Sequence, residues 1–282
     1  MSHANHLSRQ DSILAKTLDI LKASANVLGV AAKGSYAQGS RDAFSDLDVT
    51  CFLRDAERTS QPELHASVGG IAPTLSVLYL YKKHALYLFE NGVRLDLDYA
   101  RPSDLDTPDS ESLILYDPDG ILKTAFARNR RANLPSHPHH FEPGREDLID
   151  WFFWMLRQAY CWILRGAQAD HRAYTKLAAA ADSLAQIRST LVQMRLWTLG
   201  SEPFYILSVD RELADALSRT FPHLEPDEML IATRRLLECY EVVAPDYCHK
   251  AGLSFPARKC VALWKIFGEF DKLAQVASRS SD

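Results

Sequence analysis

Two short stretches near the N-terminus carry residues whose types and spacing could do chemistry. Gly34 and Ser35 form a small-residue turn that lets backbone N–H groups approach a phosphate closely. Asp46 and Asp48 follow, with one residue between them. In an extended strand, carboxylates at positions i and i+2 point to the same face, where they can hold a hard divalent cation. The two stretches together are suited to phosphoryl-type transfer.

A third acidic stretch lies further along the chain, in a predicted strand over residues 93–99. Arg94, Asp96 and Asp98 alternate there with apolar residues and therefore share one face of the strand. Carboxylates on an otherwise apolar strand are costly unless a cation or a hydrogen-bond donor meets them. Nucleotidyl transfer with two metal ions needs about three carboxylates. We expect Asp46, Asp48 and one acid of this strand to form such a set.

The elements that must position these residues are predicted from hydrophobic periodicity and turn signals. An amphipathic pattern predicts a helix over residues 11–28, and the polar segment 54–70 carries no predicted element. An Asn-Gly pair at residues 91–92 indicates a hairpin. Strands are predicted over residues 27–32, 46–52, 75–81, 85–89, 93–99 and 113–116, and a further helix from residue 121.

The second half of the chain has the texture of a helical domain. Residues 135–144 are rich in Pro and His and are interpreted as a connector. Helices are predicted over residues 146–165, 169–199, 210–220, 226–244 and 256–278. The expected fold class is therefore α/β (α+β): a domain with a small mixed sheet over residues 1–134, then a helical bundle over residues 145–282 that walls a substrate cleft.

Composition narrows the class of partner. The chain has 282 residues, 47% of them hydrophobic, with a net charge of −4 and a pI near 6.2. This balance argues against a nucleic-acid surface, and no apolar run is long enough for a membrane span. Five scattered cysteines without a CxxC pair indicate neither a disulfide framework nor a zinc site. We expect a cytoplasmic enzyme with no nucleic-acid or membrane partner.

The spacing of the three motifs resembles a known superfamily. Gly34-Ser35, Asp46-Leu47-Asp48 and Asp96, within Arg94-Leu95-Asp96-Leu97, are similar to the motifs of the nucleotidyltransferase superfamily typified by DNA polymerase β. Residues 115–120 and the helical half, including residues 162–166, resemble the antibiotic nucleotidyltransferases that modify aminoglycosides or lincosamides.

The resemblance implies roles for individual residues. Gly34 and Ser35 would hold the nucleotide phosphates, while Asp46, Asp48 and Asp96 would bind Mg²⁺, with two ions expected. Asp96 would also be the general base that takes the acceptor hydroxyl proton, with Asp98 as its alternative.

Two further residues of the first motif are candidates for nucleotide binding. Ser40 and Arg41 lie in the loop between the Gly-Ser turn and Asp46. They are candidate triphosphate contacts, and a plain surface loop is the alternative interpretation.

The leading hypothesis is a Mg²⁺-dependent enzyme that transfers a nucleoside monophosphate to a hydroxyl of a small molecule. The expected donor is ATP, which would supply AMP, and another NTP is the alternative donor. An antibiotic acceptor would make it a resistance enzyme. One alternative is a protein-modifying, AMPylating nucleotidyltransferase of the toxin-antitoxin type, and another is a nucleotide-binding module without turnover. The sequence leaves open the acceptor, the donor nucleotide and whether the chain forms a homodimer.

Overall fold

The computed structural model describes residues 3–54, 61–80, 84–104, 112–128, 143–167, 173–200 and 210–279. The chain divides into two compact units, Met1–Glu142 and Pro143–Asp282. Most of the predicted connector, residues 135–142, lies outside the described residues.

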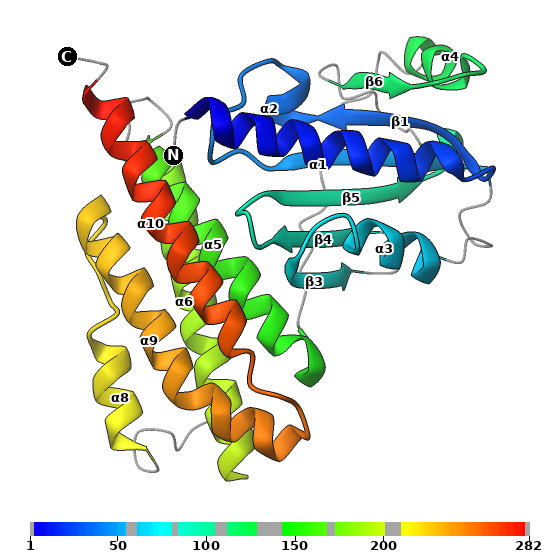
Figure 1. The fold of residues 1–282 in the computed structure, drawn as a ribbon. Helices are drawn as coiled ribbons and strands as arrows, with labels where there is room; N and C mark the ends of the chain where they lie inside the picture. Colours follow the sequence, from blue (N-terminus) through cyan, green and yellow to red (C-terminus); the bar gives the residue numbers. More distant parts are fainter. Residues whose placement is uncertain are drawn as a thin grey trace. The chain divides into compact units, whose positions relative to one another are not determined.

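The first unit is built on a six-stranded sheet in the order β3-β4-β5-β2-β1-β6 (Figure 1). β2 and β5 run parallel, and the other neighbouring pairs are antiparallel, so the sheet is mixed as predicted. The strands are β1 (Val27–Lys33), β2 (Leu47–Leu53), β3 (Thr74–Leu80), β4 (His84–Phe89), β5 (Arg94–Ala100) and β6 (Leu113–Tyr116).

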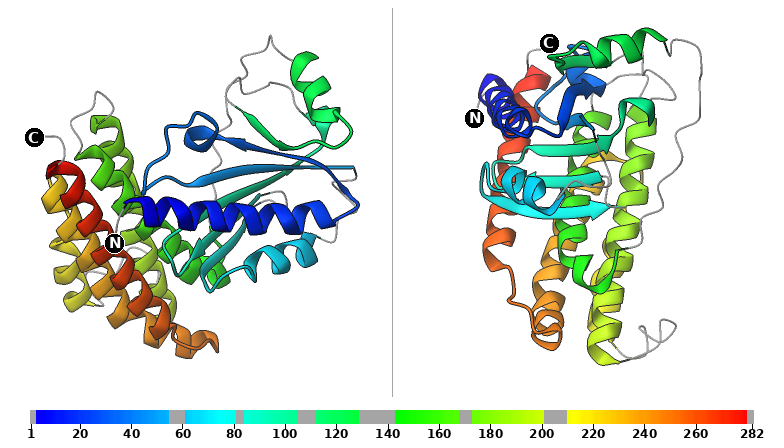
Figure 2. Two further views of the ribbon diagram at one scale, coloured as in Figure 1. Left: turned by 45° about the horizontal axis from the view of Figure 1, so that its top comes forward. Right: turned by 90° about the vertical axis from the view of Figure 1, so that its right-hand side faces the viewer.

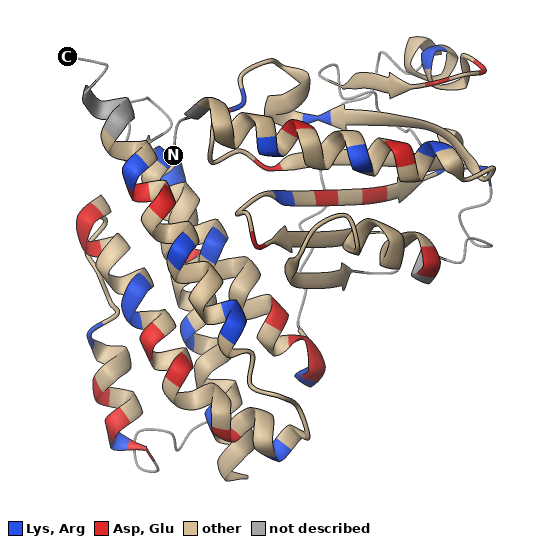
Figure 3. Cartoon of the chain, in the orientation of Figure 1, with Lys and Arg blue, Asp and Glu red and all other residues tan. Residues whose placement is uncertain are grey.

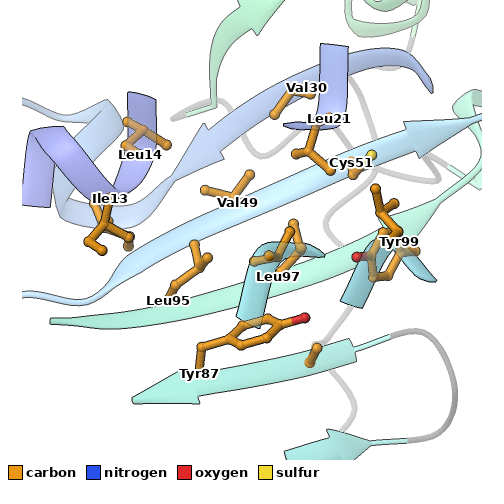
Figure 4. Close-up of a cluster of buried hydrophobic side chains, with 14 of the residues drawn as sticks. Ile13, Leu14, Leu21, Val30, Val49, Cys51, Tyr87, Leu95, Leu97 and Tyr99 are labelled. Atoms are coloured by element: carbon orange, nitrogen blue, oxygen red, sulfur yellow. The ribbon is translucent and has the colours of Figure 1, made fainter. Parts of the chain in front are cut away.

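Helices cover both faces of this sheet. α1 (His3–Ala23) and α3 (Gln61–Gly69) lie on one face (Figure 2), and α4 (Ile121–Arg128) packs on the other around Phe52. On the α1 face, Leu95 and Leu97 of β5 lie beneath the apolar side chains of α1 (Figure 4). Period-2 alternation therefore gives the central strands one apolar face and leaves their acidic positions on the other.

Helix α1 begins earlier and ends earlier than predicted. It starts at His3 rather than at residue 11, and it ends at Ala23. The upstream turns escaped the apolar pattern because polar side chains fill their buried positions: His6 and Gln10 are fully buried. A search for apolar periodicity does not detect such a face.

The polar segment 54–70, for which no element was predicted, contains α3. Residues 55–60 of this segment lie outside the described residues. Leu64 and Val68, one turn apart, join the core under the sheet. With only these two apolar anchors, the segment carries too little periodicity to be recognised from sequence.

The second unit is entirely helical where the structure describes it. Its helices are α5 (Leu148–Gly166), preceded by a 3-10 turn η2 (Arg145–Asp147), then α6 (Ala173–Leu199), α8 (Arg211–Ser218), α9 (Pro226–Ala251) and α10 (Ala257–Arg279). Stacked aromatic pairs join them: Phe152 with Tyr240 at 4.1 Å between centroids, and Tyr160 with Phe267 at 4.0 Å.

Helix α9 corrects one predicted boundary. The prediction ended this helix at residue 244, yet the helix continues through Pro245 to Ala251 and stops at Gly252, which has φ 69°. A proline inside a helix removes one hydrogen bond. Burial of Tyr247 and Cys248 beyond it offsets this cost, since both side chains are about 1% exposed.

A buried polar cluster lies between α3 and the sheet, on the face that α1 also covers. His65 on α3 is 5% exposed, and its Nδ1 lies 2.9 Å from the hydroxyl of Tyr87. The Tyr99 hydroxyl is 3.5 Å from the same nitrogen. Burial lowers the pKa of His65 to about 4, so this side chain is neutral at physiological pH.

This shift predicts acid sensitivity that a single substitution removes. The unfolded chain binds a proton at His65 more readily than the folded one, so stability is complete above pH 6.5 and falls as the pH drops toward 4. The loss is at most about 3–4 kcal/mol, because burial lowers the pKa of His65 from 6.5 to about 4. Denaturant unfolding at pH 7 and at pH 4.5 should show a smaller difference for His65→Asn than for the parent. Equal differences would contradict this account.

Candidate active site

The parallel pairing of β2 with β5 brings the predicted carboxylates together. In this register Asp48 lies opposite Asp96, and Asp46 stands one residue before β2 begins. Acidic and basic positions follow one another along β5 (Figure 3). The side chains of Asp46 and Asp96 are only 17% and 14% exposed. The three predicted acids therefore come from neighbouring strand positions and are largely shielded from water.

Arg94, the first residue of β5, joins two of these acids. Its Nη2 donates to Asp96 Oδ2 at 2.8 Å and lies 3.0 Å from Asp46 Oδ2, while its Nε donates to Asp96 Oδ1 at 3.2 Å. The Arg94 side chain is 5% exposed. Although burial lowers its pKa, the carboxylates of Asp46 and Asp96 raise it above the usual value, so this guanidinium stays charged.

The environment of Asp48 disfavours its charged form. Burial, together with the neighbouring carboxylates of Asp96 and Asp46, raises its pKa to about 7. Burial also raises the pKa of Asp96, against the opposing effect of Arg94. Carboxylates held close together in a shielded site repel one another and attract positive charge. This electrostatic setting suits a bound cation better than it suits an empty site.

The backbone of Gly34 lies close to the Asp48 carboxylate. It follows β1, at the start of the single helical turn α2 (Gly34–Ala37), with φ 58°. Lys33 lies opposite Asp48 in the β1–β2 register. A Cβ at Gly34 would lie 2.7 Å from Asp48 Oδ2, so any other residue would displace this carboxylate and would also strain the backbone at positive φ. Ser35 follows it, half-buried in the same turn.

The loop between α2 and β2 holds the other two predicted nucleotide contacts. Arg41 makes two hydrogen bonds to Asp11 of α1, at 2.6 and 2.9 Å, and its guanidinium lies 4.8 Å from the centroid of the Tyr36 ring. Ser40 is exposed, and its hydroxyl donates to Gln38. Arg41 is therefore tied to the first helix, while Ser40 remains at the surface.

Gln10 is a supporting residue that sequence reasoning missed. Its buried side-chain amide donates to the backbone oxygens of Asp42 and Ser45, each at 3.1 Å. Asp42 in turn accepts from the N–H of Phe44 and the hydroxyl of Ser45. These bonds fix the loop immediately before Asp46. Nothing in the local sequence marks Gln10 as buried.

Asp98 occupies a different setting from Asp96. It lies opposite Thr50 of β2 and His84 of β4, and its Oδ1 is 2.6 Å from His84 Nδ1. Its side chain is 42% exposed. Burial alone would lower the pKa of His84, but Asp98 outweighs it and raises that pKa. His84 was missed, although a hairpin that turns at Asn91 and Gly92 would have placed it opposite Asp98.

The donor atoms at this site fit a hard divalent cation in type. Asp46, Asp48 and Asp96 offer oxygen ligands, which Mg²⁺ prefers. In the part of the chain that the structure describes, however, no three acidic, His or Cys side chains stand gathered around a single point as metal ligands would. Arg94 bridges two of the three acids instead. The oxygen ligands that Mg²⁺ prefers are therefore present, and the Arg94 guanidinium neutralises part of their negative charge.

One comparison with known proteins identifies a family. A family model described as streptomycin adenylyltransferase matches residues 8–261. Among solved structures, an aminoglycoside 6-adenyltransferase from Bacillus subtilis matches with 13% identity and a TM-score of 0.36, over 92% of this chain and 95% of that one. No curated protein matches the sequence significantly. Among the described helices, none has the length and hydropathy that a membrane crossing requires.

The close approach of Gly34 to Asp48 leads to a prediction with a matched control. Gly34→Ala and Gly39→Ala both place a side chain at positive φ, at 58° and 68°, and each should cost about 1–2 kcal/mol of stability. Only Gly34→Ala pushes against the Asp48 carboxylate, because a Cβ at Gly39 has no neighbour within 4 Å.

Displacing that carboxylate should lower the rate of nucleotidyl transfer by roughly 10²-fold in Gly34→Ala alone. Denaturant unfolding and initial rates of the two variants measure the two effects separately. Similar rates in both variants would mean that the close approach of Gly34 to Asp48 does not affect the transfer rate.

Proposed function

Because the chain belongs to the streptomycin adenylyltransferase family, we propose that it transfers AMP from ATP to a hydroxyl group of an aminoglycoside antibiotic and releases pyrophosphate. The chain is an adenylyltransferase by its family. A lincosamide is the second class of acceptor. Modification of such an antibiotic in the cytoplasm would give the enzyme a role in resistance.

One observation carries this proposal: Asp48 and Asp96 lie opposite each other on parallel strands, with Gly34 packed against Asp48. Buried, mutually repelling carboxylates favour positive charge, and a glycine at positive φ keeps the space beside them open for a ligand. A metal-assisted attack of a hydroxyl oxygen on a phosphorus atom relies on carboxylates that hold the cation in this way.

The roles of the residues follow from the bonds that change. An acceptor hydroxyl oxygen forms a bond to the α-phosphorus of ATP, the bond from that phosphorus to the β-phosphate oxygen breaks, and pyrophosphate leaves. The hydroxyl proton passes to Asp96 in this proposal. Mg²⁺, held by Asp46, Asp48 and Asp96, would neutralise the charge of the phosphates. Gly34 and Ser35 would lie against the triphosphate.

The register favours Asp96 over Asp98 as the third carboxylate. Asp96 lies directly opposite Asp48, whereas Asp98 is two residues further along β5, roughly 7 Å away, and is paired with His84. The family assignment also favours a small-molecule acceptor over a protein acceptor or a module without turnover.

The carboxylates predict a clear order of losses. Asp48→Asn and Asp96→Asn should each lower kcat/KM by roughly 10²- to 10³-fold, since each removes an oxygen that meets charge in the transition state. Asp98→Asn should stay within about tenfold of the parent. Pyrophosphate release with ATP, Mg²⁺ and streptomycin, then with other aminoglycosides and lincosamides, measures these rates.

The stability of Asp48→Asn shows whether a loss of activity comes from a missing metal ligand or from unfolding. The pKa of Asp48 is raised to about 7, which means that its ionised form is disfavoured in the metal-free protein. Asp48→Asn should therefore unfold at a denaturant concentration equal to or higher than the parent at pH 8. Near-full transfer by Asp48→Asn would refute the mechanism.

Arg41 allows a test of the proposed triphosphate contact. If Arg41 contacts ATP, Arg41→Gln should raise KM for ATP about tenfold or more, as expected for one charge-assisted hydrogen bond. Asp11→Asn weakens its ion pair and leaves the guanidinium in place, so KM for ATP should stay near that of the parent. An unchanged KM in Arg41→Gln would assign Arg41 to the α1 contact alone.

A further inference from the structure

Arg94 is the buried cation of the acidic cluster, and its geometry is specific. One guanidinium nitrogen, Nη2, reaches carboxylates from two places in the chain, Asp96 on its own strand and Asp46 before β2. A second nitrogen, Nε, completes a fork on Asp96. A planar guanidinium can make this fork, whereas the ammonium of lysine acts as a point charge.

Burial makes this arrangement expensive. Transfer of a guanidinium out of water is unfavourable, and this cost is recovered only where carboxylates surround it with good geometry. On the opposite face, β5 carries apolar residues that pack into the core. The packing of β5 in the sheet does not itself depend on a buried charge at residue 94. The arginine therefore serves the carboxylates.

We propose that Arg94 is a positioning residue that holds Asp46 and Asp96 in place before substrates bind, and that its fixed charge makes divalent-metal binding depend on the nucleotide. This inference rests on the proposed function of the same carboxylates. With Arg94 in place, part of the negative charge at the site is already balanced, so a free metal ion gains little there. The additional negative charge of a triphosphate restores the attraction.

The direct test measures metal binding without catalysis. Free Mn²⁺ is quantified by electron paramagnetic resonance in titrations of the nucleotide-free protein. The parent should bind Mn²⁺ weakly, and Arg94→Met should bind it at least roughly tenfold more tightly because one nearby positive charge is gone. Arg94→Lys keeps the charge and should bind Mn²⁺ about as weakly as the parent. Equal affinity in the parent and Arg94→Met would overturn the proposal.

A matched control removes a buried arginine from the other unit. Arg157 on α5 is fully buried, with its guanidinium 5.7 Å from the centroid of the Phe270 ring. Arg157→Met should lose stability without a gain in Mn²⁺ affinity. The same gain in this variant would attribute the effect to loosened structure and would also overturn the proposal.

Kinetics provide the second arm. Loss of the fork should displace Asp96 and lower kcat roughly 10²-fold in Arg94→Met, while KM for the acceptor stays near the parental value. Arg94→Lys should recover part of kcat. A change in KM alone would show that Arg94 contacts the acceptor and would contradict a positioning role. If the parent transfers no nucleotide to any acceptor, the proposed function fails, and the Mn²⁺ titration still decides the role of Arg94.

Discussion

Mutual repulsion among the carboxylates on β2 and β5 is the constraint on which the rest of the first unit depends. The parallel register forces Asp48 and Asp96 side by side, and burial strengthens their interaction because little water screens them. Two features make this tolerable. Arg94 neutralises part of the charge from within the sheet, and Asp48 takes up a proton more readily than an isolated aspartate does. The site is therefore polarised before any ligand arrives.

Apolar packing on the opposite face of the same strands offsets the unfavourable burial of these charged groups. Leu47, Val49 and Cys51 of β2 and Leu95, Leu97 and Tyr99 of β5 are all at most 3% exposed and pack with α1 and α3. Each fully buried aliphatic side chain contributes about 1.5–3 kcal/mol. Strand alternation thus couples the two faces, since a one-residue slip would bury the acids and expose the core.

Local pattern explains which parts of this design were predictable. Alternation along residues 46–52 and 93–99 placed the acids on one face, and the structure confirms that face and the mixed sheet. The pairing of His84 with Asp98 follows from the register of the hairpin at Asn91 and Gly92, so the sequence did carry a signal for it. The role of Gln10 depends on contacts between distant segments, which linear spacing does not contain. The start of α1 and the passage of α9 through Pro245 were mispredicted for a related reason: tertiary burial, absent from local propensity, decided both.

The supporting contacts differ in how they constrain the acids, and this difference has consequences for the site. Asp96 lies within a strand paired on both sides, so the ladder fixes its backbone. Asp46 precedes its strand, and its position depends on a loop that Gln10 holds by two hydrogen bonds and on the ion pair with Arg94. Asp46 is therefore the carboxylate with the least backbone restraint. Arg94 is fixed in β5, and its ion pair therefore restrains the side chain of Asp46.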